Sequence, residues 1–488
     1  MSEAGKNVMM SDVSAICLNQ NLSINKNVEY QDLFEKKERK KLQRKSLQNL
    51  IVFSLCYFLT YTGFWALSNL QSTMNAAGGL GDYSQAVIYI FSMISSLFLP
   101  TVLIDKFGCK NILVFGTVIC CFSIGSNMYL RWDLMMTAAV AFGMVNGPYI
   151  SSQTFYIDEM ATRFQSTLNE NLEFIMAAFF GVLMFFSEST QIWGNVIAYY
   201  VLRNGEAPAR NVSTSFVCGE KFSPSDTDLN ENLDPPTDHQ RLLLVGIYLA
   251  MSFLSVVILV IFLDPLKNDV KAGNSWRTVL ERFIAAFKQL RNPQQFLMVP
   301  LSIYIGMEGP FYSNEVTQAY IACSWGVHHV GFVTVCFGVC GALMSLLVGP
   351  LVKCISQMAV LILAALANVS ICIVLFLWEP TPEFKTMYFV IAGVWGMGDA
   401  IWWSQVTALY GLMFPNDREA AFSNLYFWSF LGFFLSYSYA NYFTVAVKIN
   451  ILLCFLLAGM LGYMIGQIRL KCSSRKEYVP IPDSGDSS

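Results

Sequence analysis

Three acidic residues lie inside apolar stretches of the chain, where a charged side chain is costly. Asp399 lies in the run WGMGDAIWWSQ, and Glu308 and Glu315 lie on either side of Gly309-Pro310. An acid within a membrane helix needs a counter-charge, water or a proton, so such residues are candidates for ion or substrate contacts. A Gly-Pro break beside them is typical of helices that expose backbone carbonyls to a cation. The pattern therefore indicates a cation or proton site.

Asp399 is expected to face the interior of the protein. At helical spacing, Trp395, Asp399 and Trp402 share one face, and an acid on that face must point away from lipid. The functional interpretation is an ion or substrate contact. The alternative is a packing hydrogen bond, with Gln153 or Asn195 as the partner.

Glu308 and Glu315 are two helical turns apart and are expected to project from nearly the same face, as one cation or proton site. The alternative is that Glu315 lies at the wet outer end of its helix and that Glu308 is paired within the bundle. Amides in the apolar segments are further candidates, although each can simply bridge helices; they are Gln153, Gln191, Asn195 and Gln405.

Composition predicts a membrane protein. Of 488 residues, 55% are hydrophobic and only 13% are charged, about half the charged fraction of a soluble domain. The lipid bilayer is therefore the first partner, and a nucleic acid is not expected. The 13 cysteines show no metal-ligand spacing, and no nucleophile, phosphate loop or catalytic pair is recognisable. We expect no enzyme, no metal and no cofactor.

Twelve apolar segments are long enough to be membrane helices. They are residues 47–70, 86–104, 112–129, 134–157, 174–200, 242–263, 296–322, 327–352, 358–378, 387–414, 422–442 and 445–468. The predicted fold class is an all-α polytopic membrane protein with twelve transmembrane helices in two six-helix halves. This arrangement resembles the major facilitator superfamily.

The chain divides into five parts. A basic tail (1–46) precedes the N-terminal half (47–263), a linker with an amphipathic helix (264–295) precedes the C-terminal half (296–469), and a short tail (470–488) follows. With both termini in the cytosol, 24 of the 31 Lys and Arg residues lie on the cytosolic side. The loop at 203–240 then lies outside, and its Asn211 is a predicted glycosylation site.

Two features link the halves to the superfamily. A shift of about 250 residues places Ser152-Gln153 on Ser404-Gln405 and Pro100 on Pro350, which indicates an internal repeat. The loop after the second segment resembles the superfamily's gating loop, in which acid and base latch neighbouring helix ends. Its candidate residues are Asp105, Lys106, Gly108 and Lys110.

Cysteines and tails add two predictions. Cys218 and Cys323 are the only cysteines placed on the oxidising side, so we expect a disulfide between them. The tails carry tyrosine-x-x-apolar patterns that clathrin adaptors read, at Tyr478 to Ile481 and at Tyr30 to Leu33. Chance occurrence is the alternative for such short patterns.

Several runs resemble the Unc-93 ("uncoordinated") family, closest to its A-type members. They are SNLQS (68–72), GLG (79–81), IWGN (192–195), GVWGMGDA (393–400), ALYG (408–411) and EAAF (419–422). The resemblance implies an accessory role: one member regulates a two-pore potassium channel, and another escorts a membrane receptor to endosomes. We expect a regulatory or trafficking subunit of a potassium channel or other receptor, in the plasma membrane or else an endosomal membrane. The alternative is a cation- or proton-coupled secondary transporter of a small solute.

Overall fold

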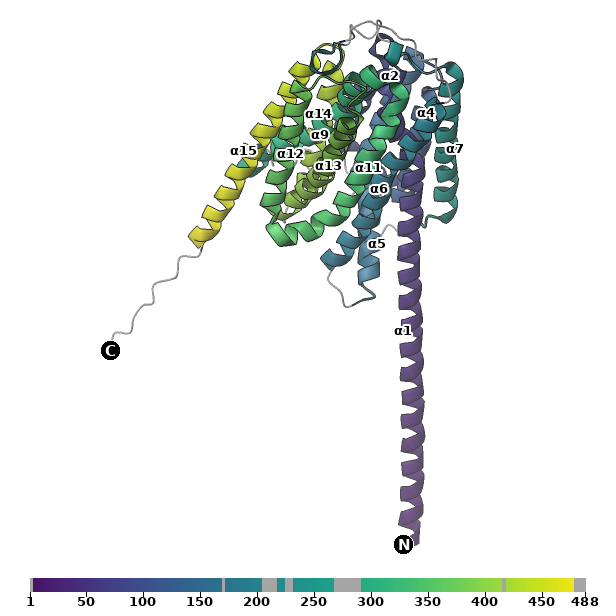
Figure 1. Ribbon diagram of the computed structural model, residues 1–488. Helices are drawn as coiled ribbons and strands as arrows, with labels where there is room; N and C mark the ends of the chain where they lie inside the picture. Colours follow the sequence, from purple (N-terminus) through teal and green to yellow (C-terminus); the bar gives the residue numbers. More distant parts are fainter. Residues whose placement is uncertain are drawn as a thin grey trace, which may run out of the picture. The chain divides into compact units, whose positions relative to one another are not determined.

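The computed structural model describes residues 3–168, 172–203, 217–223, 231–266, 291–414 and 418–477, and every regular element in these ranges is helical. The longer helices are α1 (Glu3–Ser68), α3 (Leu80–Phe107), α4 (Cys109–Ser126), α5 (Trp132–Gln165), α6 (Leu172–Arg203), α7 (Asp238–Phe262), α9 (Pro293–Pro310), η5 (Phe311–Ala322), α11 (Val327–Ile355), α12 (Gln357–Leu377), α13 (Lys385–Met413), α14 (Arg418–Tyr439) and α15 (Val445–Glu477) (Figure 1). Short turns of helix are α2 (Gln71–Met74), η1 (Ala77–Gly79), η2 (Gly219–Lys221), η4 (Glu231–Leu233) and α10 (Cys323–Trp325).

The chain forms two compact units, which we describe separately. The first combines residues 1–51 with 157–180; within it the amide of Asn49 lies 3.8 Å from the sulfur of Met160, and Phe164 packs on Phe179. The second combines residues 52–156 with 181–488. Apart from two ion pairs within α1, the contacts discussed below lie within this second unit.

Each apolar segment expected from the sequence lies mostly in helix, and the first and seventh segments differ most from the expected ranges. The first membrane segment was expected to begin at 47, whereas α1 begins at Glu3. Charged pairs one turn apart favour this continuation: Arg39 lies 3.5 Å from Glu35 and Lys41 lies 3.6 Å from Glu38. The seventh segment is divided at Pro310, where the α-helix α9 gives way to the π-helix η5.

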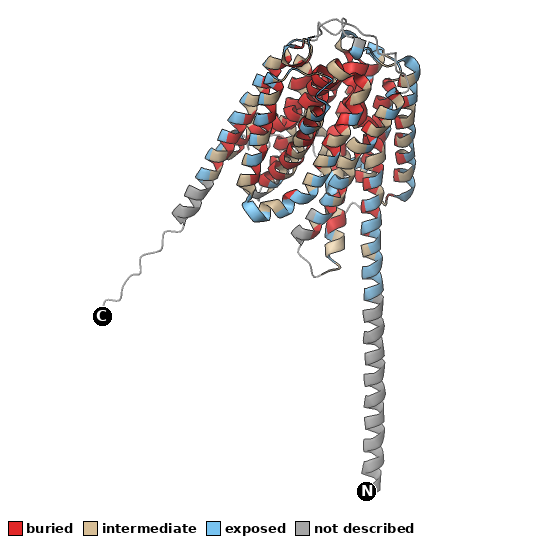
Figure 2. Cartoon of the chain, viewed as in Figure 1, coloured by how far each residue is buried: buried red, intermediate tan, exposed pale blue. Residues whose placement is uncertain are grey.

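The protein is a multi-pass membrane protein. Among the described residues, 7 helical stretches are long and apolar enough to cross a membrane. They are Glu35–Ser68, Cys109–Ser126, Trp132–Gln165, Asp238–Phe262, Val327–Ile355, Gln357–Leu377 and Val445–Arg469. Their outer faces carry large apolar side chains, such as Phe253 and Ile261 of α7, which are 65% and 64% exposed (Figure 2). Such a surface is stable only against lipid.

The N-terminal and C-terminal halves of the chain meet through two pairs of helices. Helix α3 packs on α14, where Tyr89 stacks on Phe433 at 4.2 Å between ring centroids. Helix α11 packs on α6, where a Cβ at Gly331 would stand 2.6 Å from the carbonyl oxygen of Asn195. A shift of 250 residues maps α3 onto α11 and α6 onto α14. The internal repeat expected from the sequence therefore relates one contact to the other.

The segment between α6 and α7 is joined to the end of η5 by the disulfide expected from the sequence. Cys218 and Cys323 are bonded, with their Cα atoms 5.8 Å apart. A second bond supports the same attachment, since the amide of Asn232 donates to the carbonyl of Cys323 at 3.0 Å. The two halves of the chain are thus covalently connected at this end.

We expect the purified, non-reduced protein to show neither Cys218 nor Cys323 as a free thiol, because both sulfurs are in the bond. The Cys323→Ser variant should expose one additional thiol, that of Cys218. Quantitative thiol labelling followed by peptide mapping checks both statements. Labelling of both residues in the wild-type protein without a reductant would contradict the pairing.

Candidate functional site

The acids of the seventh segment are positioned by a helix that changes its winding between them. Asn292 caps α9 by accepting a hydrogen bond from the backbone N–H of Gln294 at 3.0 Å, and Pro293 follows at the first helical position. Pro310 has no N–H to donate, and the chain continues as the wider π-helix η5. The Gly-Pro break predicted from the sequence is therefore present as a change of helix type.

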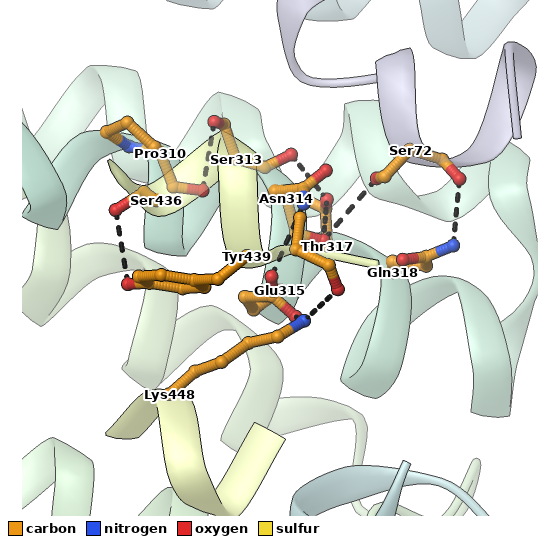
Figure 3. Close-up of polar contacts among 11 residues, drawn as sticks. Ser72, Pro310, Ser313, Asn314, Glu315, Thr317, Gln318, Ser436, Tyr439 and Lys448 are labelled. Carbon is orange, nitrogen blue, oxygen red and sulfur yellow. Dashed lines mark hydrogen bonds and ion pairs between the residues drawn. The ribbon is translucent and has the colours of Figure 1, made fainter. Parts of the chain in front are cut away.

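The change of winding separates Glu308 from Glu315. Glu315 lies in η5, where its carboxylate accepts a hydrogen bond from Lys448 of α15 at 2.7 Å (Figure 3). The side chains of this ion pair are only 4% and 2% exposed. The prediction that Glu308 and Glu315 serve one site is therefore wrong, and so is the alternative that Glu315 is wet.

Lys448 lies near the start of α15, and a lysine at a helix end is usually too shallow to balance an intramembrane acid. It is three residues into α15, but this end of the helix is buried against η5 and the end of α14. Its ammonium group also donates to the carbonyl of Ala440 at 2.6 Å. Glu315 thus has a buried base, because burial depends on neighbouring elements and not on distance from the helix terminus.

Three carboxyl groups form a second cluster, which we call the acid cluster: Glu188 of α6, Glu308 of α9 and Asp399 of α13. Glu308 and Asp399 lie within hydrogen-bonding reach of each other. Glu188 is close enough to Asp399 for an electrostatic interaction between the two carboxyl groups. Its Oε2 atom is 3.0 Å from the point where a Cβ at Gly341 would stand. The cluster thus joins a helix of the N-terminal half to two helices of the C-terminal half.

Glu308 is the most isolated of the three. It is 0% exposed, and neither carboxyl oxygen has a hydrogen-bond donor in the described protein. Asp399 is half-buried and accepts a hydrogen bond from Trp403. Since a buried carboxylate without a donor is strongly disfavoured, the pair must be satisfied by something other than the described side chains.

An amide of α12 completes the cluster. Asn368 is 2% exposed and donates to the hydroxyl of Tyr304 at 2.6 Å, while its Oδ1 atom has no partner among the described residues. This oxygen lies 2.5 Å from the position of a Cβ at Gly398, so only glycine fits there. Gly396 likewise admits the backbone of Phe337, as the close approach of helices predicted from WGMGD requires.

The aromatic face predicted beside Asp399 is present. Trp395 is 1% exposed and stacks on Phe311, with 5.5 Å between ring centroids. Trp402 is 0% exposed and meets Tyr304 edge-on at 5.3 Å. These rings shield the acid cluster from lipid on the α13 side.

The amide candidates do not reach the acid cluster. Asn195 lies with Gln191 and Asn69 in a network of the N-terminal half, in which Asn69 donates to Gln191 at 2.9 Å. Asn195 is therefore not the partner of Asp399. Gln405 contacts Ser404, with 3.4 Å between the side-chain atoms, and the Oε1 atom of Gln153 has no partner among the described residues. A packing bond to either predicted amide thus does not explain Asp399.

The gating-loop candidates form a tight turn between α3 and α4. Gly108 adopts a φ of 76°, which favours glycine, and so lets α4 begin at the next residue. Lys110 donates to the carbonyl of Val260 near the end of α7 at 3.0 Å, whereas Lys106 lies over the ring of Phe107 and Asp105 is half-buried. Lys110 therefore connects the start of α4 to the end of α7 through this hydrogen bond.

Some predictions fall outside the described residues. They include the glycosylation site at Asn211, the C-terminal sorting pattern from Tyr478 to Ile481 and the amphipathic linker helix, of which 267–290 are not described. The side chains of Tyr30 and Leu33 are also outside the description.

Sequence reasoning missed Glu188. It is a single acid within the apolar segment 174–200, just as Asp399 is within its own segment. A search for every acid inside an apolar segment would have found it. Chemically, three carboxyl groups without a described base can bind a proton or a cation.

The chain is similar to known proteins over most of its length. Residues 72–464 match the family model for "Ion channel regulatory protein UNC-93". It is 33% identical to "Protein unc-93 homolog A" of Xenopus laevis, covering 86% of this chain and 92% of that protein. It is 29% identical to "Putative potassium channel regulatory protein unc-93" of Caenorhabditis elegans, covering 88% of this chain and 62% of that protein.

Solved structures show the same fold. A mutant of the nucleoside transporter NupG superposes with a TM-score of 0.60 at 14% identity, covering 86% of this chain and 99% of that one. At this identity the likeness concerns the fold alone. It agrees with the major-facilitator arrangement expected from the repeat.

Proposed function

Because the chain belongs to the UNC-93 family of ion channel regulatory proteins, we propose that it is a regulatory or trafficking subunit of another membrane protein. A potassium channel of the two-pore type is the proposed partner. The observation that carries this proposal is the similarity, over 439 residues, to the protein of Caenorhabditis elegans that is named for potassium channel regulation.

The contacts between the halves support a scaffold more than an open transport path. Gln318 of η5 donates to the carbonyl of Ser72 at 2.8 Å, and Ser72 donates to the carbonyl of Asn314 at 3.4 Å (Figure 3). Ser68 and Tyr437 are 3.4 Å apart at their hydroxyl groups. These bonds hold the N-terminal half against the C-terminal half beside the buried ion pair.

Co-expression with a two-pore potassium channel tests this proposal. The expected result is a change in the number of channels at the cell surface or in the current per channel, measured by surface biotinylation and whole-cell recording. A soluble-protein control and an unrelated twelve-helix transporter separate a specific effect from overexpression. An unchanged channel in both measurements would contradict the proposal.

A secondary transporter coupled to a cation or a proton is the second candidate function. The fold of the superposed transporter and the buried acid cluster both favour it. A transporter requires the acids Glu308 and Asp399 for flux, whereas an accessory subunit needs them only if they support the binding-competent conformation.

We expect Asp399→Asn to leave abundance near the wild-type level but to impair whichever activity the protein has. The isosteric amide keeps the shape and removes the charge, so folding should tolerate it. Flux into liposomes and channel modulation are measured in parallel, with Glu379→Gln as an exposed-acid control. Normal activity of Asp399→Asn in both assays would indicate that Asp399 has a purely structural role.

We further propose the complete topology: twelve transmembrane helices, in halves 47–263 and 296–469, with both termini in the cytosol. Tags before Met1 and after Ser488 should be accessible only after permeabilisation, and Asn211 should carry a glycan. The excess of basic residues on the cytosolic side supports this orientation. Glycosylation at an engineered sequon near Lys271 would contradict it.

The tails are proposed to bring the protein to its membrane. The patterns at Tyr478 and Tyr30 fit clathrin adaptors, which would move the protein between the plasma membrane and endosomes. Tyr478→Ala and Tyr30→Ala should then increase the surface fraction. An unchanged rate of internalisation in the variant that carries both substitutions would show that clathrin adaptors do not recognise these tails.

A further inference from the structure

The geometry of the acid cluster points to a bound proton: we propose that Glu308 and Asp399 share one proton, and that Glu188 makes this proton site part of the contact between the two halves. The inference goes beyond the proposed function and does not depend on it.

The chemistry of two neighbouring carboxyl groups requires a proton between Glu308 and Asp399. Glu308 and Asp399 lie within hydrogen-bonding reach, yet two ionised carboxylates have only acceptor atoms. A hydrogen bond between them therefore requires a proton on one of the four oxygens. Two like charges at this separation in a buried site cannot both persist, which is why paired carboxyl groups retain a proton.

The surroundings of the three acids contain no described base. The other titratable groups that act on the three acids are Tyr57 of α1, Tyr304 of α9 and Cys372 of α12, all of which are neutral at physiological pH. No described lysine, arginine or histidine is among the groups that act on them. The buried Lys448 is already engaged by Glu315.

An independent observation is the burial of Glu308. Its side chain is 0% exposed, and neither carboxyl oxygen has a hydrogen-bond donor among the described residues. A site built to hold an ionised Glu308 would instead supply donors.

Glu188 gives the proton a role in the contact between the halves. It comes from α6 of the N-terminal half, whereas Glu308 and Asp399 come from the C-terminal half. Loss of the shared proton places a second negative charge next to Asp399 and opposite Glu188, in a buried site where no described base screens it. The contact between the halves is then weakened. Proton binding and this contact therefore stabilise each other.

Infrared spectroscopy of the full-length protein in lipid nanodiscs tests the proton directly. The wild-type protein is expected to show the carbonyl stretch of a protonated carboxyl group at neutral pH. Glu308→Gln and Asp399→Asn should each remove or shift that band, while the exposed-acid control Glu379→Gln leaves it unaltered. A wild-type spectrum without the band, or a band that both cluster variants leave unchanged, would overturn the proposal.

Thermal unfolding as a function of pH tests the coupling to the halves. The wild-type melting temperature should fall from mildly acidic to alkaline pH, because Glu308 and Asp399 then lose the shared proton and the contact between the halves weakens. Glu188→Gln should reduce this fall, and Asp399→Asn should abolish it. An equal fall in the wild type and in both variants would overturn the role of the cluster. Neither measurement involves a channel, so its failure is distinct from failure of the proposed function.

Discussion

Lys448→Met is expected to be the most damaging single change to a charged residue in the described protein. It leaves the buried carboxylate of Glu315 without its base, and breaking a buried ion pair in this way typically costs about 3 to 5 kcal/mol. That is a large part of the stability of a protein domain. The expected result is a sharp loss of monodisperse protein and of surface abundance.

Glu315→Gln combined with Lys448→Met separates the pair from other effects of the mutation. The double variant removes both charges of the ion pair, so it should recover most of the melting temperature that Lys448→Met loses. Lys385→Met, at an exposed lysine, is the matched control and should be close to wild type. A double variant as unstable as the single one would show that Glu315 is not the group that needs Lys448.

Gly306→Ala and Gly432→Ala are expected to disrupt the crossing of α9 and α14. A Cβ at Gly306 would stand 1.8 Å from the carbonyl oxygen of Ser429, and a Cβ at Gly432 would stand 2.2 Å from that of Ile303. Because both neighbours are backbone atoms, they cannot turn aside as a side chain would. The cost should reach about 3 kcal/mol or more, at the upper end for overpacking.

The control for this crossing is Gly246→Ala in α7. No heavy atom lies within 4 Å of the Cβ that it adds, and alanine favours a helix more than glycine does. Its melting temperature should equal or slightly exceed that of the wild type. Normal abundance of both Gly306→Ala and Gly432→Ala would contradict the close approach of the two helices.

The fold was predictable from the sequence because apolar length and charge asymmetry act locally. The apolar segments, the equivalence of Pro100 and Pro350, and the break at Gly309-Pro310 all have counterparts in helices. The disulfide between Cys218 and Cys323 was also predictable, since topology left a single pair on the oxidising side. These properties depend on composition and position along the chain.

The partners of the acids were not predictable, because they depend on how helices far apart in sequence pack. Helical spacing placed Glu308 and Glu315 together, but the π-helix η5 gives the second acid a different neighbour. Lys448 appeared to be a helix-end residue, although tertiary packing buries it. Glu188 reaches Asp399 only because Gly341 and Gly396 let the helices between them approach closely.

The account predicts two separate properties: a regulatory action on a partner channel and a proton held within the protein itself. The channel claim would survive loss of the proton, since family membership supports it. The proton claim would survive loss of the channel, since the geometry of Glu308 and Asp399 supports it. Only the first is the central claim about function.

The most direct measurement reconstitutes a purified two-pore potassium channel in liposomes, with and without the purified protein, and records potassium flux at equal channel density. The account predicts that the protein changes the flux through the channel and carries no potassium flux by itself. Unchanged channel flux in liposomes that contain both proteins, together with solute uptake by the protein alone, would contradict the regulatory function and establish the transporter.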